Sequence, residues 1–198
     1  MDIALLQENV VKNNMGFYYV DNKKEAKDLV ESLLLKDSNI VFGGSMTLKE
    51  AGITDMVNQG PYKVVSRDDY EKMFTADYIL TSTNAITQDG LLYNVDGLSN
   101  RVACISHGPK KVIVVTGKNK LCKDISEAIL RVKHVAAPLN AKRLKKDTHC
   151  AKQGKCISDD INKGCSSPER LCASFLISGM QRIKNRITVI LVNEDLGY

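Results

Sequence analysis

Residues 40–52, IVFGGSMTLKEAG, join a short apolar run to a helix-like segment through a Gly-Gly-Ser turn. The same alternation recurs along the chain, with apolar runs at 17–20, 39–42, 62–65, 78–83, 111–117 and 186–192. Strand and helix units that follow one another in this way form crossover connections, which favour a parallel sheet with helices on both faces. The sequence therefore predicts an α/β fold.

Two further segments carry local signals. Residues 85–97, AITQDGLLYNVDG, place an Asp89-Gly90 pair between apolar residues, which predicts a hairpin at the carboxyl end of a strand. Nearer the amino terminus, Asn22 and Glu25 have the spacing of a capping box, which predicts a helix that continues through Leu35.

Length and composition indicate one globular domain. The 198 residues are 43% hydrophobic and 26% charged, which is enough apolar material for one sizeable core. The amino terminus lacks the basic stretch and apolar run of a secretory signal, and no segment approaches the roughly 18 apolar residues of a membrane span. We therefore expect a cytoplasmic protein of one domain, residues 1–198, without a membrane partner.

Four of the six cysteines lie close together in the last quarter of the chain, namely Cys150, Cys156, Cys165 and Cys172. In a reducing compartment, clustered cysteines are more often metal ligands or redox groups than disulfides. We expect residues 148–175 to form a cysteine-rich, metal-binding segment within the domain. Cys104 and Cys122 lie outside it, in apolar stretches that predict helices, and are interpreted as small core residues.

The net charge of +5 is mild, but residues 142–155 carry six Lys and Arg side chains. A nucleic-acid partner is not expected, because no aromatic residues are interleaved with this run and Trp is absent from the chain. Two interpretations remain: a solvated helix face, or a positive field that favours thiolates and offsets a negatively charged metal–thiolate centre. Both can hold together.

The Gly-Gly-Ser turn is the first candidate binding motif. Gly43 and Gly44 allow a ligand close to the backbone, and Ser45 and Thr47 add hydroxyl groups at a helix start that attracts anions. Its predicted place at the carboxyl end of a strand is where open α/β sheets bind ligands. Glu50 is interpreted either as a charge that complements the helix dipole or as an acid in the cleft. A plain tight turn would have a similar sequence.

A second polar stretch follows the predicted strand at 78–83. Its side chains are typical turn formers, Asn84, Asp89, Asn94, Asp96 and Asn100. Turn geometry explains each of them singly, but their number at the carboxyl end of one strand indicates the rim of a pocket.

These motifs together resemble the LUD-domain family, named for lactate utilisation. The resemblance is carried by GGSMTLKEAGI (43–53), ADYILTSTNAITQDGLLYNVDGLSNRVA (76–103), GPKKVIVVTGKNKL (108–121), AILRVKHVAAPLNAKRL (128–144) and VILVNEDLGY (189–198). It implies a three-layer α/β sandwich with a mainly parallel sheet, similar to ribose-5-phosphate isomerase and CoA transferases. It also implies a ligand cleft between the GGS turn, the TQDG excursion and the GKNK loop. Some family members are implicated in oxidising lactate to pyruvate alongside separate iron–sulfur subunits.

The resemblance also implies functional residues. Glu50, Lys120 and Glu194 are the expected catalytic groups. The matching positions of the binding motifs are Gly43, Gly44, Ser45, Thr47, Asp89, Gly90, Asn94, Asn100 and Asn119. With Asn84 from the polar stretch, and without Asn94, these are the expected substrate-binding residues. A lysine just past a strand end can pair with a carboxylate or phosphate, whereas without the family context Lys120 would be interpreted as a solvated loop residue.

The four clustered cysteines follow the pattern C-x5-C-x8-C-x6-C. A subset of LUD proteins ends in a similar segment, commonly with a C-x2-C in the middle, from which this chain departs. Zinc usually takes such knuckles, whereas a cubane cluster takes one thiolate per iron and tolerates wider spacings. We therefore predict a [4Fe–4S] cluster, with zinc second, a redox dithiol or non-metal role third, and His149 as a reserve ligand. Pro168 predicts a helix that contains Cys172, and the segment is expected to fold back over the cleft.

Two classes of function follow. In the first, the protein is an iron–sulfur enzyme or subunit, an oxidoreductase component that acts on a small carboxylate in lactate or organic-acid metabolism. In the second, it is a non-catalytic sensor or scaffold with a structural zinc or iron–sulfur site. The expected partners are a small anionic metabolite, a redox partner protein that carries electrons away, and a second copy of the chain in a homodimer. No complete dinucleotide fingerprint is present, so lactate oxidation would need another subunit.

Overall fold

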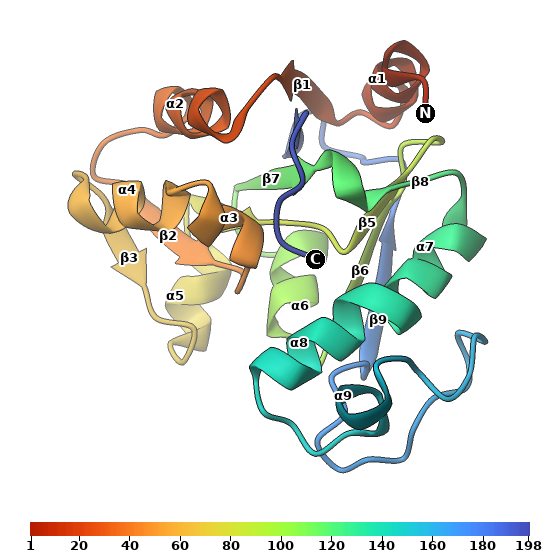
Figure 1. Ribbon diagram of the computed structural model, residues 1–198. Helices are drawn as coiled ribbons and strands as arrows, with labels where there is room; N and C mark the ends of the chain where they lie inside the picture. Colours follow the sequence, from red (N-terminus) through yellow and green to blue (C-terminus); the bar gives the residue numbers. More distant parts are fainter.

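The computed structural model describes residues 1–198. Its central element is a six-stranded parallel sheet with the order β1-β10-β7-β4-β2-β3 (Figure 1). The strands are β1 (Gly16–Val20), β2 (Asn39–Phe42), β3 (Lys63–Val65), β4 (Tyr78–Thr81), β7 (Lys111–Gly117) and β10 (Ile187–Val192). The predicted parallel sheet is confirmed.

Helices cover both faces of this sheet, so the predicted three-layer α/β sandwich is also confirmed (Figure 1). One face packs against α2 (Lys23–Leu33), α3 (Met46–Glu50) and α4 (Ile53–Gln59). The other packs against α1 (Ile3–Lys12), α5 (Tyr70–Thr75) and α6 (Asn100–Ser106).

Strand β7 shows why the central strands are apolar without interruption. Val112 and Val114 lie in the core on the α1 side, whereas Ile113 and Val115 lie in the core on the α2 side. Successive side chains of a strand point to opposite faces, and both faces of this sheet are covered.

A second, four-stranded sheet lies beside the first, with the order β8-β5-β6-β9. Its strands are β5 (Ala85–Thr87), β6 (Leu92–Asp96), β8 (Leu121–Cys122) and β9 (Ser174–Ser178). Strands β5 and β6 form the predicted hairpin, and Gly90 takes the positive φ of 76° at its turn. A nearly continuous helical run packs on this sheet, with α7 (Ile125–Arg131), a π-helix (Val132–Ala136) and α8 (Ala137–Arg143). The short helix α9 (His149–Gln153) follows.

Three local predictions were wrong. Pro168 begins only a turn, in which Arg170 N–H donates to the Ser167 carbonyl, so Cys172 lies in a loop and not on a helix. That loop leads into β9, which the sequence did not predict and which pairs with β6. Cys122 lies on β8 and not on a helix, and the helix that begins after Asn22 ends at Leu33 and not at Leu35.

None of the helices is long and apolar enough to span a lipid bilayer.

Candidate functional site

The candidate cleft lies at the carboxyl edge of the six-stranded sheet. Because its strands are parallel, the segments that follow β2, β4, β7 and β10 meet there. From β2 the chain passes to β3 on one side and returns to β4 on the other. Open α/β sheets bind ligands at such a point, where the connections diverge.

The Gly43-Gly44 turn lies directly under two arginines. A Cβ atom on Gly43 would lie 2.5 Å from Thr81 Oγ1 and 3.0 Å from the Arg101 side chain, and one on Gly44 would lie 3.0 Å from an Arg67 guanidinium nitrogen. A side chain at Gly43 would clash with Thr81, whereas at Gly44 the exposed Arg67 side chain is the only close neighbour. Gly43, Arg67, Asn100 and Arg101 are among the residues that line a small pocket here, with an empty volume of about 180 Å³.

Helix amides contribute little to this pocket. Helix α3 has only five residues, and Ser45 Oγ accepts the hydrogen bond of Leu48 N–H at its start. Ser45 is therefore a helix cap, and positive charge in the cleft comes from side chains.

Lys120 is buried, with 3% of its surface exposed, so the interpretation as a solvated loop residue is wrong. It ends the 3₁₀ turn Lys118–Lys120 that follows β7, and its Nζ donates to Thr47 Oγ1 at 2.7 Å and to Ser82 Oγ at 3.0 Å. Burial, with the nearby charges of Arg131 and Arg101, lowers the pKa of Lys120 from 10.5 to about 7. A substantial share of the amine is therefore neutral at neutral pH.

Arg101 and Arg131 flank Lys120, and we call these three residues the cation cluster. Arg101 is held by the carbonyl oxygens of Ser82 and Val95 and by the side-chain oxygens of Asn84 and Asn94. Arg131 donates to the carbonyl oxygens of Asn119 and Asn84. No carboxylate forms an ion pair with any of the three.

Asn84 and Asn100 serve this arrangement in different ways. Asn84 Oδ1 accepts from Arg101 and from Val95 N–H, so this oxygen orients the guanidinium. Asn100 lies on the pocket wall, where its Oδ1 accepts from Arg101 N–H.

The last residues of the chain cover Lys120. Gly197 N–H donates to Glu50 Oε2 at 2.6 Å, Asn119 Nδ2 donates to the Gly197 carbonyl, and Thr47 Oγ1 donates to the Leu196 carbonyl. The predicted residues Thr47, Glu50 and Asn119 are thus brought together, but around residues 196–197. Residues 196–197 therefore cover Lys120, whereas no residue of 148–175 lines the Gly43 pocket.

Three other predicted residues lie elsewhere. Asp89 is exposed in the β5–β6 turn, and Gly90 beside it packs on α1, where a Cβ atom would lie 2.8 Å from Val10 N. The Glu194 carboxylate accepts from Lys23 N–H at the start of α2. The structure does not bring these residues to the cation cluster.

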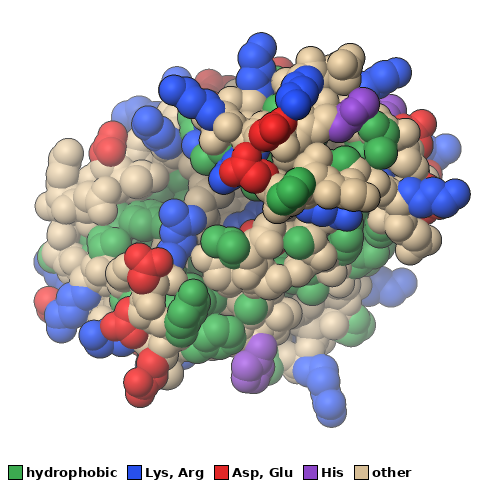
Figure 2. Space-filling view, turned by 90° about the horizontal axis from the view of Figure 1, so that it is seen from below, with side chains coloured by type: hydrophobic (Ala, Val, Ile, Leu, Met, Phe, Trp, Pro, Cys, Tyr) green, Lys and Arg blue, Asp and Glu red, His purple; other side chains and the backbone are tan.

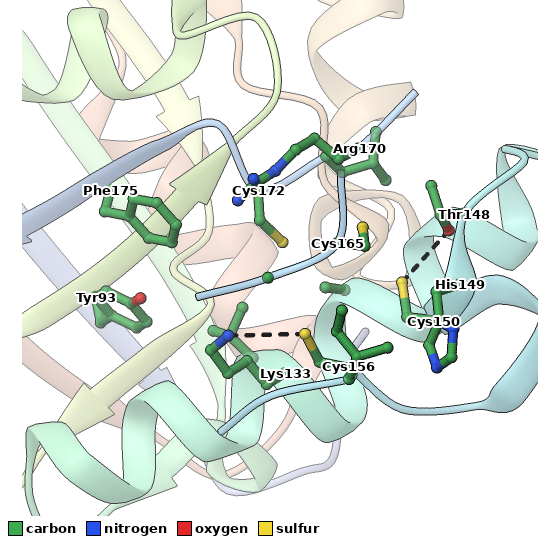
Figure 3. A pocket seen from close by; sticks show the side chains of 15 residues that line it. Tyr93, Lys133, Thr148, His149, Cys150, Cys156, Cys165, Arg170, Cys172 and Phe175 are labelled. Atoms are coloured by element: carbon green, nitrogen blue, oxygen red, sulfur yellow. Dashed lines mark hydrogen bonds between the residues drawn. The ribbon is translucent and has the colours of Figure 1, made fainter. Parts of the chain in front are cut away.

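The four clustered cysteines line one cavity, here called the cysteine cavity. Cys150 comes from α9, Cys156 and Cys165 from the following loop, and Cys172 from the residues before β9. Figure 3 shows their sulfur atoms facing a common space. Its empty volume is about 570 Å³, which includes space open to solvent.

The thiols of this cavity differ in their electrostatic setting. Burial tends to raise the pKa of Cys165, but hydrogen bonds from Ser167 and the charge of Arg170 outweigh it and lower that pKa. Burial, with Cys150 and Cys156 nearby, raises the pKa of Cys172 to about 11. No three His, Cys, Asp or Glu side chains are close enough to share a single metal ion.

Cys104 and Cys122 lie apart from the cysteine cavity. Both are buried, and burial raises the pKa of each thiol to about 11. They are core residues, as predicted.

The cation cluster and the cysteine cavity lie on opposite faces of the same elements. On β6, Tyr93 lines the cavity whereas Asn94 accepts a hydrogen bond from Arg101. At the junction of α7 and the π-helix, Arg131 belongs to the cation cluster and donates to Asn84, whereas Lys133 faces the cavity. The Lys133 Nζ atom lies 3.7 Å from Cys156 Sγ. Single-turn π-helices are often found at functional sites.

The basic run at 142–155 lies on the molecular surface. Lys146 pairs with Glu169 and Lys152 with Asp147, and these side chains are substantially exposed. Figure 2, which looks from the side of α9, shows Lys and Arg side chains with Asp and Glu among them. This arrangement agrees with the interpretation as a solvated face.

Sequence reasoning missed Arg67, Arg101 and Arg131 in the cleft. Arg101 and Arg131 lie within two of the motifs that carry the family resemblance, and Arg101 directly follows the predicted Asn100. A search for cations beside polar turn residues could have found Arg101, but nothing local distinguishes Arg67 or Arg131 from solvated helix-end charges.

Comparisons with known proteins agree with this architecture. A DUF162 family protein from Deinococcus radiodurans is similar in structure, with a TM-score of 0.56 and 13% identity, over 96% of this chain and 94% of that chain. Ribose 5-phosphate isomerase from Plasmodium falciparum gives a partial similarity that carries no weight for the fold, with a TM-score of 0.33 and 16% identity, over 51% of this chain and 52% of that chain. Comparison with curated proteins gave no match. The LUD domain profile matches residues 3–192, so the chain belongs to the LUD-domain family.

Proposed function

We propose that this protein binds a small carboxylate-type metabolite in the cleft and carries a [4Fe–4S] cluster on Cys150, Cys156, Cys165 and Cys172. It would act as an iron–sulfur enzyme or subunit, an oxidoreductase component in lactate or other organic-acid metabolism. The observation that carries the proposal is the cation cluster, in which Arg101 and Arg131 form no ion pair with a carboxylate and lie beside the buried Lys120.

Asp96 and Glu50 act on Arg101 and Lys120 without forming an ion pair with them. A buried charge that lacks a direct partner is unfavourable, so such a cluster favours an anion as its counter-charge. Arg101 reaches from the cluster to the wall of the Gly43 pocket, and Arg67 lies at the same pocket with an exposed side chain. A guanidinium binds a carboxylate through two parallel hydrogen bonds. A small carboxylate in this pocket would therefore pair with Arg67. The Nη groups of Arg101 already donate to four acceptors within the protein, so Arg101 would contribute its charge rather than a second pair of hydrogen bonds.

Lys120 is suited to a different task. Its Nζ has two hydrogen-bond acceptors, Thr47 and Ser82, which match the two N–H groups of a neutral amine and leave its lone pair free. A group whose pKa lies near the operating pH is an effective proton acceptor. In this proposal Lys120 accepts the proton that a 2-hydroxy group loses, once residues 196–197 have moved aside.

The cysteine cavity fits an anionic, thiolate-bound group, because it is lined by four thiols, Lys133 and Arg170 and by no Asp or Glu. When bound, a [4Fe–4S] cluster supplies a one-electron acceptor. The cavity shares β6 and the α7–π-helix junction with the cation cluster, which supports a common role for the two sites. Removal of two electrons from one substrate would still need a redox partner.

Replacing Arg67 by glutamine should weaken binding of L-lactate or pyruvate by about tenfold, because the variant loses a charge-assisted pair at the pocket. Isothermal titration calorimetry measures this directly. Lys63→Gln is the matched control, since it removes an exposed charge from strand β3, which precedes Arg67. Equal affinities for Arg67→Gln and the parent would remove Arg67 from the site, and no binding of any short carboxylate by the parent would refute the cleft.

A further inference from the structure

The cysteine cavity holds two cations that no carboxylate neutralises. We infer that Arg170 and Lys133 are the counter-cations of an anionic thiolate-bound centre, and that Arg170 donates hydrogen bonds to its sulfur atoms and so raises its reduction potential. This inference rests on the proposed function and adds to it two positioning residues that are not cysteines.

Arg170 has no hydrogen-bond partner for its side chain. Its Nε atom is fully buried and unpaired, and its guanidinium forms no ion pair. The guanidinium lies against Gly164, where a Cβ atom would be 3.2 Å from it, and it lines the same cavity as the four thiols (Figure 3). A buried donor without an acceptor is rare in folded proteins and costs about 1–3 kcal/mol, more for a charged group.

Lys133 is the second cation. Only 7% of its surface is exposed, and its Nζ donates to the Lys163 carbonyl at 2.7 Å and lies 3.7 Å from Cys156 Sγ. The π-helix that contains Lys133 directs it toward the cavity, two residues after Arg131, which donates to Asn84 on the side of the cleft. A carbonyl satisfies one N–H group of the ammonium but does not neutralise its charge.

Four thiolates would supply the missing negative charge. Reduction of a thiolate-bound cluster by one electron adds a further negative charge, and nearby cations stabilise that reduced state more than the oxidised one. N–H hydrogen bonds to the sulfur atoms act in the same direction. Removing either cation should therefore lower the reduction potential of the centre.

The test is a redox titration of anaerobically purified, cluster-loaded protein with dithionite, followed by absorbance and electron paramagnetic resonance. Arg170→Gln and Lys133→Met should each shift the midpoint to lower potential. Arg170→Lys keeps the charge but loses the planar fork, so its potential should lie between those of Arg170→Gln and the parent. Lys155→Met is the matched control: it removes an exposed charge that lies one residue from Cys156 but outside the cavity, and its shift should be the smallest.

Two outcomes overturn the inference in distinguishable ways. An intact cluster with the same midpoint in Arg170→Gln, Lys133→Met and the parent would refute it and leave the proposed cluster in place. A parent protein without iron, whether empty or loaded with zinc, would refute the proposed cluster and this inference together.

Discussion

The Lys120→Met protein should be more stable than the parent at neutral pH and should no longer respond to carboxylates. The pKa of Lys120 is lowered from 10.5 to about 7, which corresponds to a cost on the order of 5 kcal/mol for the buried ammonium. Methionine removes that cost but loses two hydrogen bonds, so the free energy of unfolding at pH 7 should rise by about 1–3 kcal/mol.

The stability difference between Lys120→Met and the parent should depend on pH. Between about pH 7 and pH 10.5 the unfolded chain binds the Lys120 proton and the folded chain does not, so the stability of the parent rises with pH across this window. The advantage of Lys120→Met should therefore be largest below about pH 7 and should shrink toward about pH 10. Urea unfolding at several pH values measures it.

Lys118→Met serves as the control for Lys120→Met, because Lys118 is exposed in the same 3₁₀ turn. Its stability and its carboxylate binding should match those of the parent. If Lys120→Met were less stable than the parent and its free energy of unfolding changed with pH as the parent's does, Lys120 would not be a buried amine with a lowered pKa. A Lys120→Met protein that still bound lactate with parent affinity would remove Lys120 from the proposed site.

Replacing any one of Cys150, Cys156, Cys165 or Cys172 by alanine should lower the iron content per chain by about tenfold or more, because a cubane needs a ligand for each iron. The four thiols line one cavity, so each variant should lose the same centre. Iron and sulfide analysis of protein purified without oxygen measures the loss.

The matched controls for these variants are Cys104→Ala and Cys122→Ala. Both cysteines are buried outside the cysteine cavity, so their replacement should cost some stability and leave the iron content unchanged. Iron loss in a control equal to that in the four variants would indicate general unfolding and not ligand removal. One cysteine of the four without any effect would remove that residue from the ligand set.

The fold could be predicted from the sequence because its signals are local. Apolar runs such as 111–117 are buried on both faces of the sheet, and the Asp89-Gly90 turn specifies its own hairpin. Strand β9 was missed because SFLIS is short and only half-buried, and its partner β6 lies about 80 residues earlier in the chain. Pairing over that distance leaves no local pattern.

Only part of the candidate site could be predicted, again because contacts between distant segments leave no local pattern. Gly43 and the four cysteines could be identified from residue type and position, whereas Lys120 was identified only through the family resemblance. The burial of Lys120 depends on Thr47, Ser82 and Gly197, which converge from three other segments of the chain. Arg170 likewise looks like an ordinary surface charge until the cavity beside it is seen.

The most direct test of the proposed function is the visible spectrum and metal content of the parent protein purified without oxygen. We expect a brown protein with broad absorption that bleaches in air, and about four iron and four sulfide per chain. A colourless protein with one tightly held zinc, or a metal-free protein whose four clustered thiols all react freely, would contradict it.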